Sequence, residues 1–194
     1  MLDRQTALRS ILGDVSDHLV VTGLGNAAND LAALSGDSPS VFTMDGAMGA
    51  AVSMGLGLAL ARPERSVVVV TGDGELLMNL GSLATVAVQR PPNLTIICLD
   101  NGAYGLTGDQ DTHTANGVVD LAGIATASGI SEVVTITDGE GLAGLSPIGA
   151  SGSTRFVLVK VARGNTPYPG LERNGDHLRV RFRAAVEQGL EVSR

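Results

Sequence analysis

Two short polar turns, each placed directly after an apolar segment, are the parts of this sequence best suited to chemistry. Gly72-Asp73-Gly74 follows Ser66–Thr71, and Asn101 comes shortly after Leu94–Leu99. Paired glycines allow a tight turn that exposes backbone N–H groups, and such groups at the start of a helix attract anions. The Asp73 carboxylate needs a counterion there, which a divalent cation bound to a phosphate supplies. The first turn therefore predicts a site for a phosphate and a metal ion.

The second turn adds oxygen ligands to that site. If Asp73 and Asn101 end neighbouring parallel strands, their side chains lie side by side. A carboxylate oxygen, an amide oxygen, a backbone carbonyl, two phosphate oxygens and a water complete the octahedral ligand set of Mg²⁺. Either turn alone is usually structural. Together on successive strands, with 26 residues between Gly74 and Asn101, they predict a magnesium site.

Alternating apolar and helical segments predict the framework that positions these turns. Segments typical of buried strands lie at Leu19–Thr22, Val41–Met44, Ser66–Thr71, Leu94–Leu99, Glu132–Ile136 and Phe156–Val161, and segments typical of helices lie at Asp3–Val15, Ala47–Ala61, Glu75–Gln89, Val119–Ser128, Gly139–Ala150 and around Arg181–Gln188. This alternation predicts an α/β fold with a mainly parallel β-sheet flanked by helices on both faces. Ligands of such folds bind beyond the carboxyl ends of the strands, where both turns lie.

Composition indicates the class of protein. The 194 residues carry 20 acidic and 13 basic side chains, for a formal net charge of −7, and 26 of them are glycine. This length predicts one domain over residues 1–194. The acid excess argues against binding nucleic acid or an anionic membrane, and no apolar run is long enough to cross a bilayer. We therefore expect a cytoplasmic protein with a site lined by backbone.

The two turns resemble the signature of enzymes that bind thiamine diphosphate. Upstream, Gly46-Ala47-Met48-Gly49 before a small-residue helix resembles the segment that holds the aminopyrimidine ring in 2-oxo acid decarboxylases and acetolactate synthases. The resemblance to the diphosphate-binding domain of that superfamily covers nearly the whole chain. Residues 74–81 and 104–110 are most similar to sulfopyruvate and phosphonopyruvate decarboxylases.

The resemblance implies a role for each matching residue. Asp73 and Asn101 would bind Mg²⁺ through their side chains, and Ala103 through its carbonyl. The Gly46 carbonyl would accept a hydrogen bond from the 4′-amino group of the cofactor, and Met48 would wedge between its two rings. The other cofactor-binding positions that the resemblance implies are Ala47, Gly72, Gly74, Glu75, Tyr104 and Gly105. Without the downstream Gly72-Asp73-Gly74 turn, Met48 would instead be interpreted as an apolar residue on a buried helix start.

Two acidic residues depart from the pattern. Many relatives have a small residue in place of Glu75, and an acid that faces a diphosphate would repel it. Alternatively, Glu75 caps the helix start and points away from the site, as the helix dipole favours. Asp45 has no role in the pattern; it suits a helix cap, a salt bridge across an interface or a charge that excludes some substrates.

One residue required by the superfamily has no counterpart in this sequence. The glutamate that activates the cofactor belongs to a separate pyrimidine-binding domain, and the chain is too short to contain that domain. The resemblance therefore implies a hetero-oligomer with a pyrimidine-binding subunit of similar size. The implied reaction is non-oxidative decarboxylation of a small anionic 2-oxo acid, such as sulfopyruvate or a related 3-substituted pyruvate, to an aldehyde and CO₂.

His113 is the histidine best placed for proton transfer. It lies in the polar segment 107–116, beyond the Asn101 turn, and the ordinary pKa of a histidine suits this role. A solvated loop histidine is an equally good interpretation.

Three other functions remain compatible with the sequence. A subunit of a 2-oxo acid oxidoreductase needs iron–sulfur clusters, which the lone Cys98 cannot hold, although another subunit can carry them. An acetolactate-type carboligase differs only in what reacts after CO₂ leaves. A non-catalytic nucleotide-binding module would use the Gly72-Asp73-Gly74 turn for another phosphate. The segment 23–28, Gly-Leu-Gly-Asn-Ala-Ala, is also a weak match to the dinucleotide-binding fingerprint.

Overall fold

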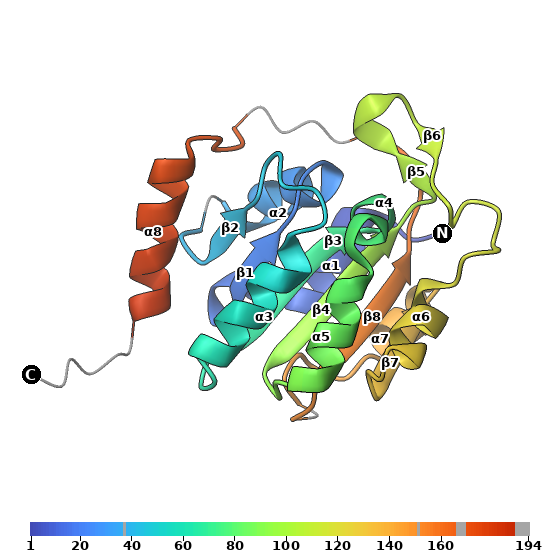
Figure 1. Cartoon of the computed structure of the whole chain (residues 1–194). Helices are drawn as coiled ribbons and strands as arrows, with labels where there is room; N and C mark the ends of the chain where they lie inside the picture. Colours follow the sequence, from blue (N-terminus) through green and yellow to red (C-terminus); the bar gives the residue numbers. More distant parts are fainter. Residues whose placement is uncertain (37, 151, 166–169, 189–194) are drawn as a thin grey trace, which may run out of the picture.

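A parallel sheet forms the centre of the protein (Figure 1). The computed structural model describes residues 1–36, 38–150, 152–165 and 170–188. Within these ranges, six strands pair in the order β2-β1-β3-β4-β8-β7. They are β1 (Leu19–Thr22), β2 (Val41–Thr43), β3 (Val67–Gly72), β4 (Leu94–Asp100), β7 (Glu132–Ile136) and β8 (Arg155–Lys160). All five pairings between them are parallel, which confirms the predicted sheet.

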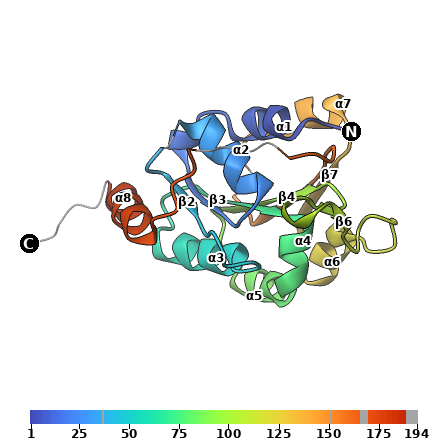
Figure 2. The ribbon, with the colours of Figure 1, turned by 90° about the horizontal axis from the view of Figure 1, so that it is seen from above.

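Helices cover both faces of this sheet (Figure 2). One face is covered by α1 (Arg4–Leu12), α2 (Asn26–Ser35) and α7 (Gly139–Ala143), and the other by α3 (Ala51–Ala61), α5 (Gly81–Gln89) and α6 (Leu121–Ala127). Alternate residues of β3 belong to two separate apolar clusters. Val67 and Val69 pack in the cluster on the α3 side of the sheet, and Val68 and Val70 pack in the cluster on the α1 side. The strand is apolar throughout because both of its faces are buried. The predicted α/β class is thus confirmed.

The remaining elements lie around the sheet. They are the short helices η1 (Val15–Asp17), α4 (Asp73–Leu76), η2 (Leu77–Asn79) and η3 (Gly105–Thr107), the hairpin strands β5 (Ala103–Tyr104) and β6 (Gln110–Asp111), and α8 (Gly175–Glu187). Helix α8 packs beside the edge strand β2, where the Phe182 and Phe42 rings are 5.3 Å apart. It thereby covers an edge that would otherwise be open to pairing. No helix in the described ranges is long and apolar enough to span a membrane.

The chain crosses from one face of the sheet to the other at a point that matters for function. Helix α2 links β1 to β2 on one face, and α3 links β2 to β3 on the opposite face (Figure 2). Strand order therefore reverses between β1 and β3, which are neighbours in the sheet. Open α/β sheets bind ligands in the crevice at such a point.

Several predicted helices differ in extent. The helix predicted at Ala47–Ala61 starts only at Ala51, because Gly46 and Gly49 have positive φ values of 83° and 88° that end any regular helix. The helix predicted at Glu75–Gln89 is divided into α4, η2 and α5. In the glycine-rich segment 139–150, only Gly139–Ala143 is helical. Helix α2 was not predicted.

Cys98 lies in β4 and is fully buried. Burial raises the pKa of its thiol well above the ordinary value, so the thiol stays protonated and unreactive. Cys98 therefore serves as a small core residue.

Candidate functional site

A cleft of about 400 Å³ lies at the carboxyl ends of β1, β3 and β4. Its walls come from the turns that follow these strands and from Met48, after β2. The predicted cofactor-binding residues that line it are Met48, Gly72, Asp73, Gly74, Glu75, Asn101, Ala103, Tyr104 and Gly105. Gly46 and Ala47 do not line the cleft, but they form the same turn as Met48. Residues from three separate segments of the sequence therefore meet in one cavity.

The turn after β3 has the geometry of an anion site. Gly72 is the N-cap of α4, and no side chain caps the helix. Its first N–H groups are thus available to a ligand. Gly74 is tightly packed: a Cβ atom there would lie 2.4 Å from Cε1 of Tyr104. A side chain at position 74 would push the hairpin away from the turn, so glycine keeps the Tyr104 side of the cleft close to it.

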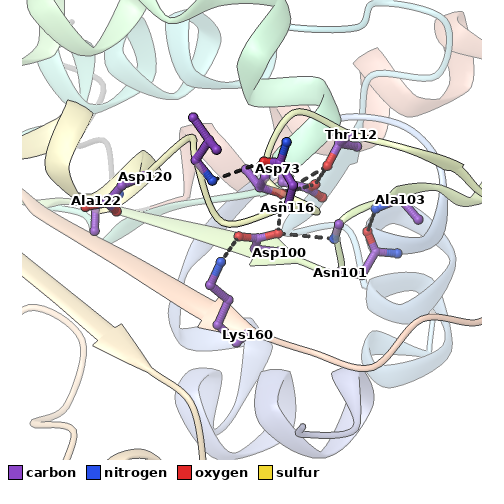
Figure 3. A network of polar contacts seen from close by, with 12 residues as sticks. Asp73, Asp100, Asn101, Ala103, Thr112, Asn116, Asp120, Ala122 and Lys160 are labelled. Atoms are coloured by element: carbon purple, nitrogen blue, oxygen red, sulfur yellow. Dashed lines mark hydrogen bonds and ion pairs between the residues drawn. The ribbon is translucent and has the colours of Figure 1, made fainter.

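Asp73 is a buried carboxylate without a basic partner among the described residues. It is 1% exposed, and its Oδ2 accepts hydrogen bonds from the hydroxyls of Thr112 and Thr114 (Figure 3). Burial, and to a smaller degree the charge of Asp100, raises its pKa, whereas the threonine hydroxyls oppose the rise. A buried anion of this kind is costly unless a cation compensates it. The observation fits a metal ligand.

The neighbouring turn offers neutral oxygen donors. Asn101 Oδ1 accepts the Ala103 N–H at 3.0 Å, and its second lone pair remains available. Asn101 and Ala103 line the cleft together with Asp73. One carboxylate, one amide and one carbonyl are the oxygen donors that hard cations prefer. Within the described residues, no group of three His, Cys, Asp or Glu side chains is suited to a metal. The donors therefore fit Mg²⁺ shared with a phosphate rather than a closed zinc site.

A network of polar side chains surrounds the buried carboxylate of Asp73 (Figure 3). The Thr114 hydroxyl lies 3.0 Å from Asp73 Oδ2 and 2.7 Å from Asp100 Oδ1, and Asp100 is paired with Lys160. Asp100 also accepts the Gly102 N–H at 3.1 Å. Because a hydroxyl has one proton, Thr114 can donate to only one of the two carboxylates at a time.

Replacement of Thr114 by valine, which has the same shape, should reduce the free energy of unfolding by about 1–3 kcal/mol, because it removes a hydroxyl from between two buried carboxylates. Denaturant unfolding of the purified chain measures this change. Thr126→Val is the matched control, since Thr126 is exposed on α6 and should change stability by less than about 0.5 kcal/mol. Equal losses of stability in the two variants would contradict the stabilising role of the Thr114 hydroxyl.

The turn before α3 presents Met48 to the cleft. Met48 is 38% exposed, so it is not the buried core residue that the alternative interpretation required. Met78 and Leu106 also line the cleft and are more than half exposed, at 54% and 58%. Three large apolar side chains therefore surround an open cleft, which is typical of a surface that a ligand or another chain covers. The position of Met48 between two cofactor rings stays a prediction.

The other candidate residues from the sequence, which are Asp45, Glu75 and His113, lie in three different environments. Asp45 forms an ion pair with Arg173 at 3.1 Å within this chain. Glu75 does not point into solvent: it is 4% exposed and lines the cleft. His113 lies between two buried threonines on its loop, but its own side chain is exposed and it is not a lining residue. The structure thus brings Glu75 into the site and leaves His113 outside the cleft. A role of His113 in proton transfer stays a prediction.

The site includes one segment that the sequence analysis did not assign. Residues 24–27 of the β1–α2 turn line the cleft opposite the β3 turn. Gly25, with a φ of 80°, is the N-cap of α2, and no side chain caps that helix either. The starts of two helices therefore border one cavity, and helix starts favour anions such as a diphosphate. The sequence signal for this wall is the glycine-rich segment 23–28, which by itself is only a weak match to the dinucleotide-binding fingerprint.

Comparison with known proteins identifies a family that this chain resembles over most of its length. Residues 25–161 match the family described as thiamine pyrophosphate enzyme, C-terminal TPP binding domain; thiamine pyrophosphate is the same compound as thiamine diphosphate. The chain is 40% identical to sulfopyruvate decarboxylase subunit beta of Methanothermobacter thermautotrophicus, over 98% of this chain and 99% of that subunit.

Longer proteins also match. Sulfopyruvate decarboxylase of Methanosarcina acetivorans is 37% identical over 95% of this chain, which spans 47% of that protein. Phosphonopyruvate decarboxylase of Streptomyces viridochromogenes is 44% identical over 69% of this chain and 33% of its own length. A solved 2-oxoglutarate:ferredoxin oxidoreductase from Magnetococcus marinus has the same fold, with a TM-score of 0.65 at 19% identity over 88% of this chain and 62% of that one.

Proposed function

Because the chain belongs to the thiamine pyrophosphate enzyme family and carries its C-terminal cofactor-binding domain, we propose that it is the diphosphate-binding subunit of a two-chain 2-oxo acid decarboxylase. Thiamine diphosphate is its cofactor, and the enzyme is a carboxy-lyase. The proposal extends to the bound metal, the partner chain and the substrate.

The observation that carries the proposal is the convergence of the predicted residues on one cleft. Asp73, Asn101 and the Ala103 carbonyl supply hard oxygen donors, and the starts of α2 and α4 supply N–H groups for the diphosphate. The turn that contains Met48, after β2, forms another wall of the cleft. We assign Mg²⁺ to the oxygen donors. When bound, thiamine diphosphate accepts the electron pair that is released as CO₂ leaves. The residues of this chain bind and orient it and neutralise its charge.

A second chain of similar size completes the site in this proposal. The chain spans 99% of a protein named as a subunit beta, but 47% of a longer protein named sulfopyruvate decarboxylase. The remainder of that longer protein is about as long as this chain, which is enough for a pyrimidine-binding domain. The exposed Met48, Met78 and Leu106 around the cleft form a surface for that second chain.

The proposed substrate is sulfopyruvate or a related pyruvate with an anionic 3-substituent. Its charged end needs cationic partners, but Arg4, which is the basic side chain among the described residues that line the cleft, and two basic residues from the β8 end of the sheet are already paired. Arg4 lines the cleft and pairs with Asp30 at 2.7 Å, and Lys160 and Arg163 pair with Asp100 and Asp111. We therefore assign recognition of the sulfonate mainly to the partner chain.

A substrate series tests this assignment. The copurified complex, supplied with thiamine diphosphate and Mg²⁺, should release CO₂ from sulfopyruvate with a kcat/KM at least about tenfold above that for phosphonopyruvate or pyruvate. A tenfold preference corresponds to about 1.4 kcal/mol of differential transition-state binding. A preference for phosphonopyruvate would change the substrate assigned here. A requirement for an external electron acceptor, or formation of acetolactate from pyruvate, would instead favour the oxidoreductase or carboligase.

A further inference from the structure

Gly49, the residue after Met48, is hydrogen-bonded to the α4–η2 segment of the chain. Its carbonyl accepts a hydrogen bond from Asn79 Nδ2 at 3.1 Å. Asn79 is the last residue of η2, which directly follows α4.

The backbone of Gly49 also packs closely on the same segment. A Cβ atom at position 49 would lie 3.0 Å from Cβ of Met78 and 3.2 Å from Cβ of Asn79. With its φ of 88°, Gly49 has a conformation that other residues rarely adopt. Glycine is therefore needed at position 49 for two reasons: its backbone conformation and its close approach to η2.

Glu75 is itself held in a fixed place. Its Oε2 accepts the Thr71 hydroxyl at 3.0 Å, and its side chain is 96% buried, being 4% exposed. The carboxyl group fills the space beside Gly23, where a Cβ atom would lie 1.8 Å from Oε1. Glu75 thus contacts the ends of β1 and β3 and anchors the α4–η2 segment to them. Because Asn79 belongs to the same segment, its hydrogen bond to Gly49 joins the Met48 turn to these strand ends.

We propose that Asn79 forms a clamp on Gly49 that fixes the Met48 turn relative to the diphosphate turn. Asn79 is a positioning residue: it acts on the cofactor through Met48 and Gly46. The proposal rests on the proposed function for its effect on the cofactor, but the clamp itself belongs to the free chain.

Hydrogen exchange of the purified chain, without cofactor, tests the clamp directly. Asn79→Ala should speed exchange in residues 46–54 by about tenfold, the effect of one lost hydrogen bond, without a similar change in β3 or β4. Ser53→Ala is the matched control, because Ser53 is exposed and lies 3.5 Å from the same Asn79 nitrogen. Unchanged exchange in Asn79→Ala, or an equal change in Ser53→Ala, would overturn the clamp.

Binding measurements on the copurified complex then test the effect on the cofactor. Asn79→Ala should weaken thiamine diphosphate about tenfold in the presence of Mg²⁺, but should change the Kd of inorganic pyrophosphate by less than about twofold, because the clamp acts on the Met48 side. Equal weakening of both ligands would overturn the positioning role. If the wild-type complex binds no thiamine diphosphate, the proposed function fails, whereas hydrogen exchange still decides whether the clamp exists.

Discussion

Replacement of Asp73 by alanine is expected to weaken metal-dependent binding of thiamine diphosphate by at least about a hundredfold. Changes in the second shell of a metal site already cost about 10- to 100-fold, and Asp73 is the charged member of the proposed donor set. It is buried, and no described basic side chain pairs with it. Calorimetric titration of the copurified complex with thiamine diphosphate, with and without Mg²⁺, measures the loss.

The same variant should remain folded, and its stability separates a binding defect from a folding defect. Burial and the Asp100 charge raise the pKa of Asp73, which means that its charged form is held at a cost in the free chain. Alanine removes that cost, so the free energy of unfolding should stay within about 1–2 kcal/mol of the wild type. Asp120→Ala is the control: Asp120 caps α6 and should affect stability by about 1 kcal/mol but not cofactor binding. Full cofactor affinity in Asp73→Ala would refute the metal assignment.

The second large effect concerns the partner chain. The purified chain alone, given thiamine diphosphate and Mg²⁺, should release CO₂ from sulfopyruvate at least about a thousandfold more slowly than the complex, since positioned acid–base groups typically contribute 10²- to 10⁴-fold. Among the glutamates in the described ranges, Glu75 is the one that lines the cleft. It packs beside Gly23 and Thr71 at the strand ends, which is the diphosphate side of the proposed site.

A continuous CO₂-release assay with increasing amounts of the partner chain checks this expectation. Activity should rise with the amount of partner and reach its plateau when the two chains are equal in number. Activity of the isolated chain within about tenfold of that plateau would contradict the proposed division of the site between two chains.

The central strands and the two polar turns were accessible from sequence because they depend on local patterns. Val67–Thr71 and Leu94–Leu99 are so strongly apolar that only strands buried on both faces suit them, and both are strands in the structure. A glycine-flanked Asp73 after such a strand has few conformations available. The position of Asp73 and Asn101 in the same cleft then follows from the parallel pairing of β3 with β4.

Features that depend on distant contacts were not accessible in this way. The segment Glu75–Gln89 has a continuous helical pattern, yet it is interrupted at η2, where Met78 and Asn79 pack against Gly49 from another turn. Thr112 and Thr114 are ordinary loop residues by sequence, and they are buried only because their loop folds back onto Asp73. His113, which lies between them, faces the opposite way for the same reason.

Native mass spectrometry of the chain purified with its associated proteins tests the central claim most directly. The account predicts an assembly that contains this chain and a second chain of similar size in equal numbers, with one thiamine diphosphate and one Mg²⁺ for each pair. An assembly of this chain alone that takes up no thiamine diphosphate after incubation with the cofactor and Mg²⁺ would contradict it.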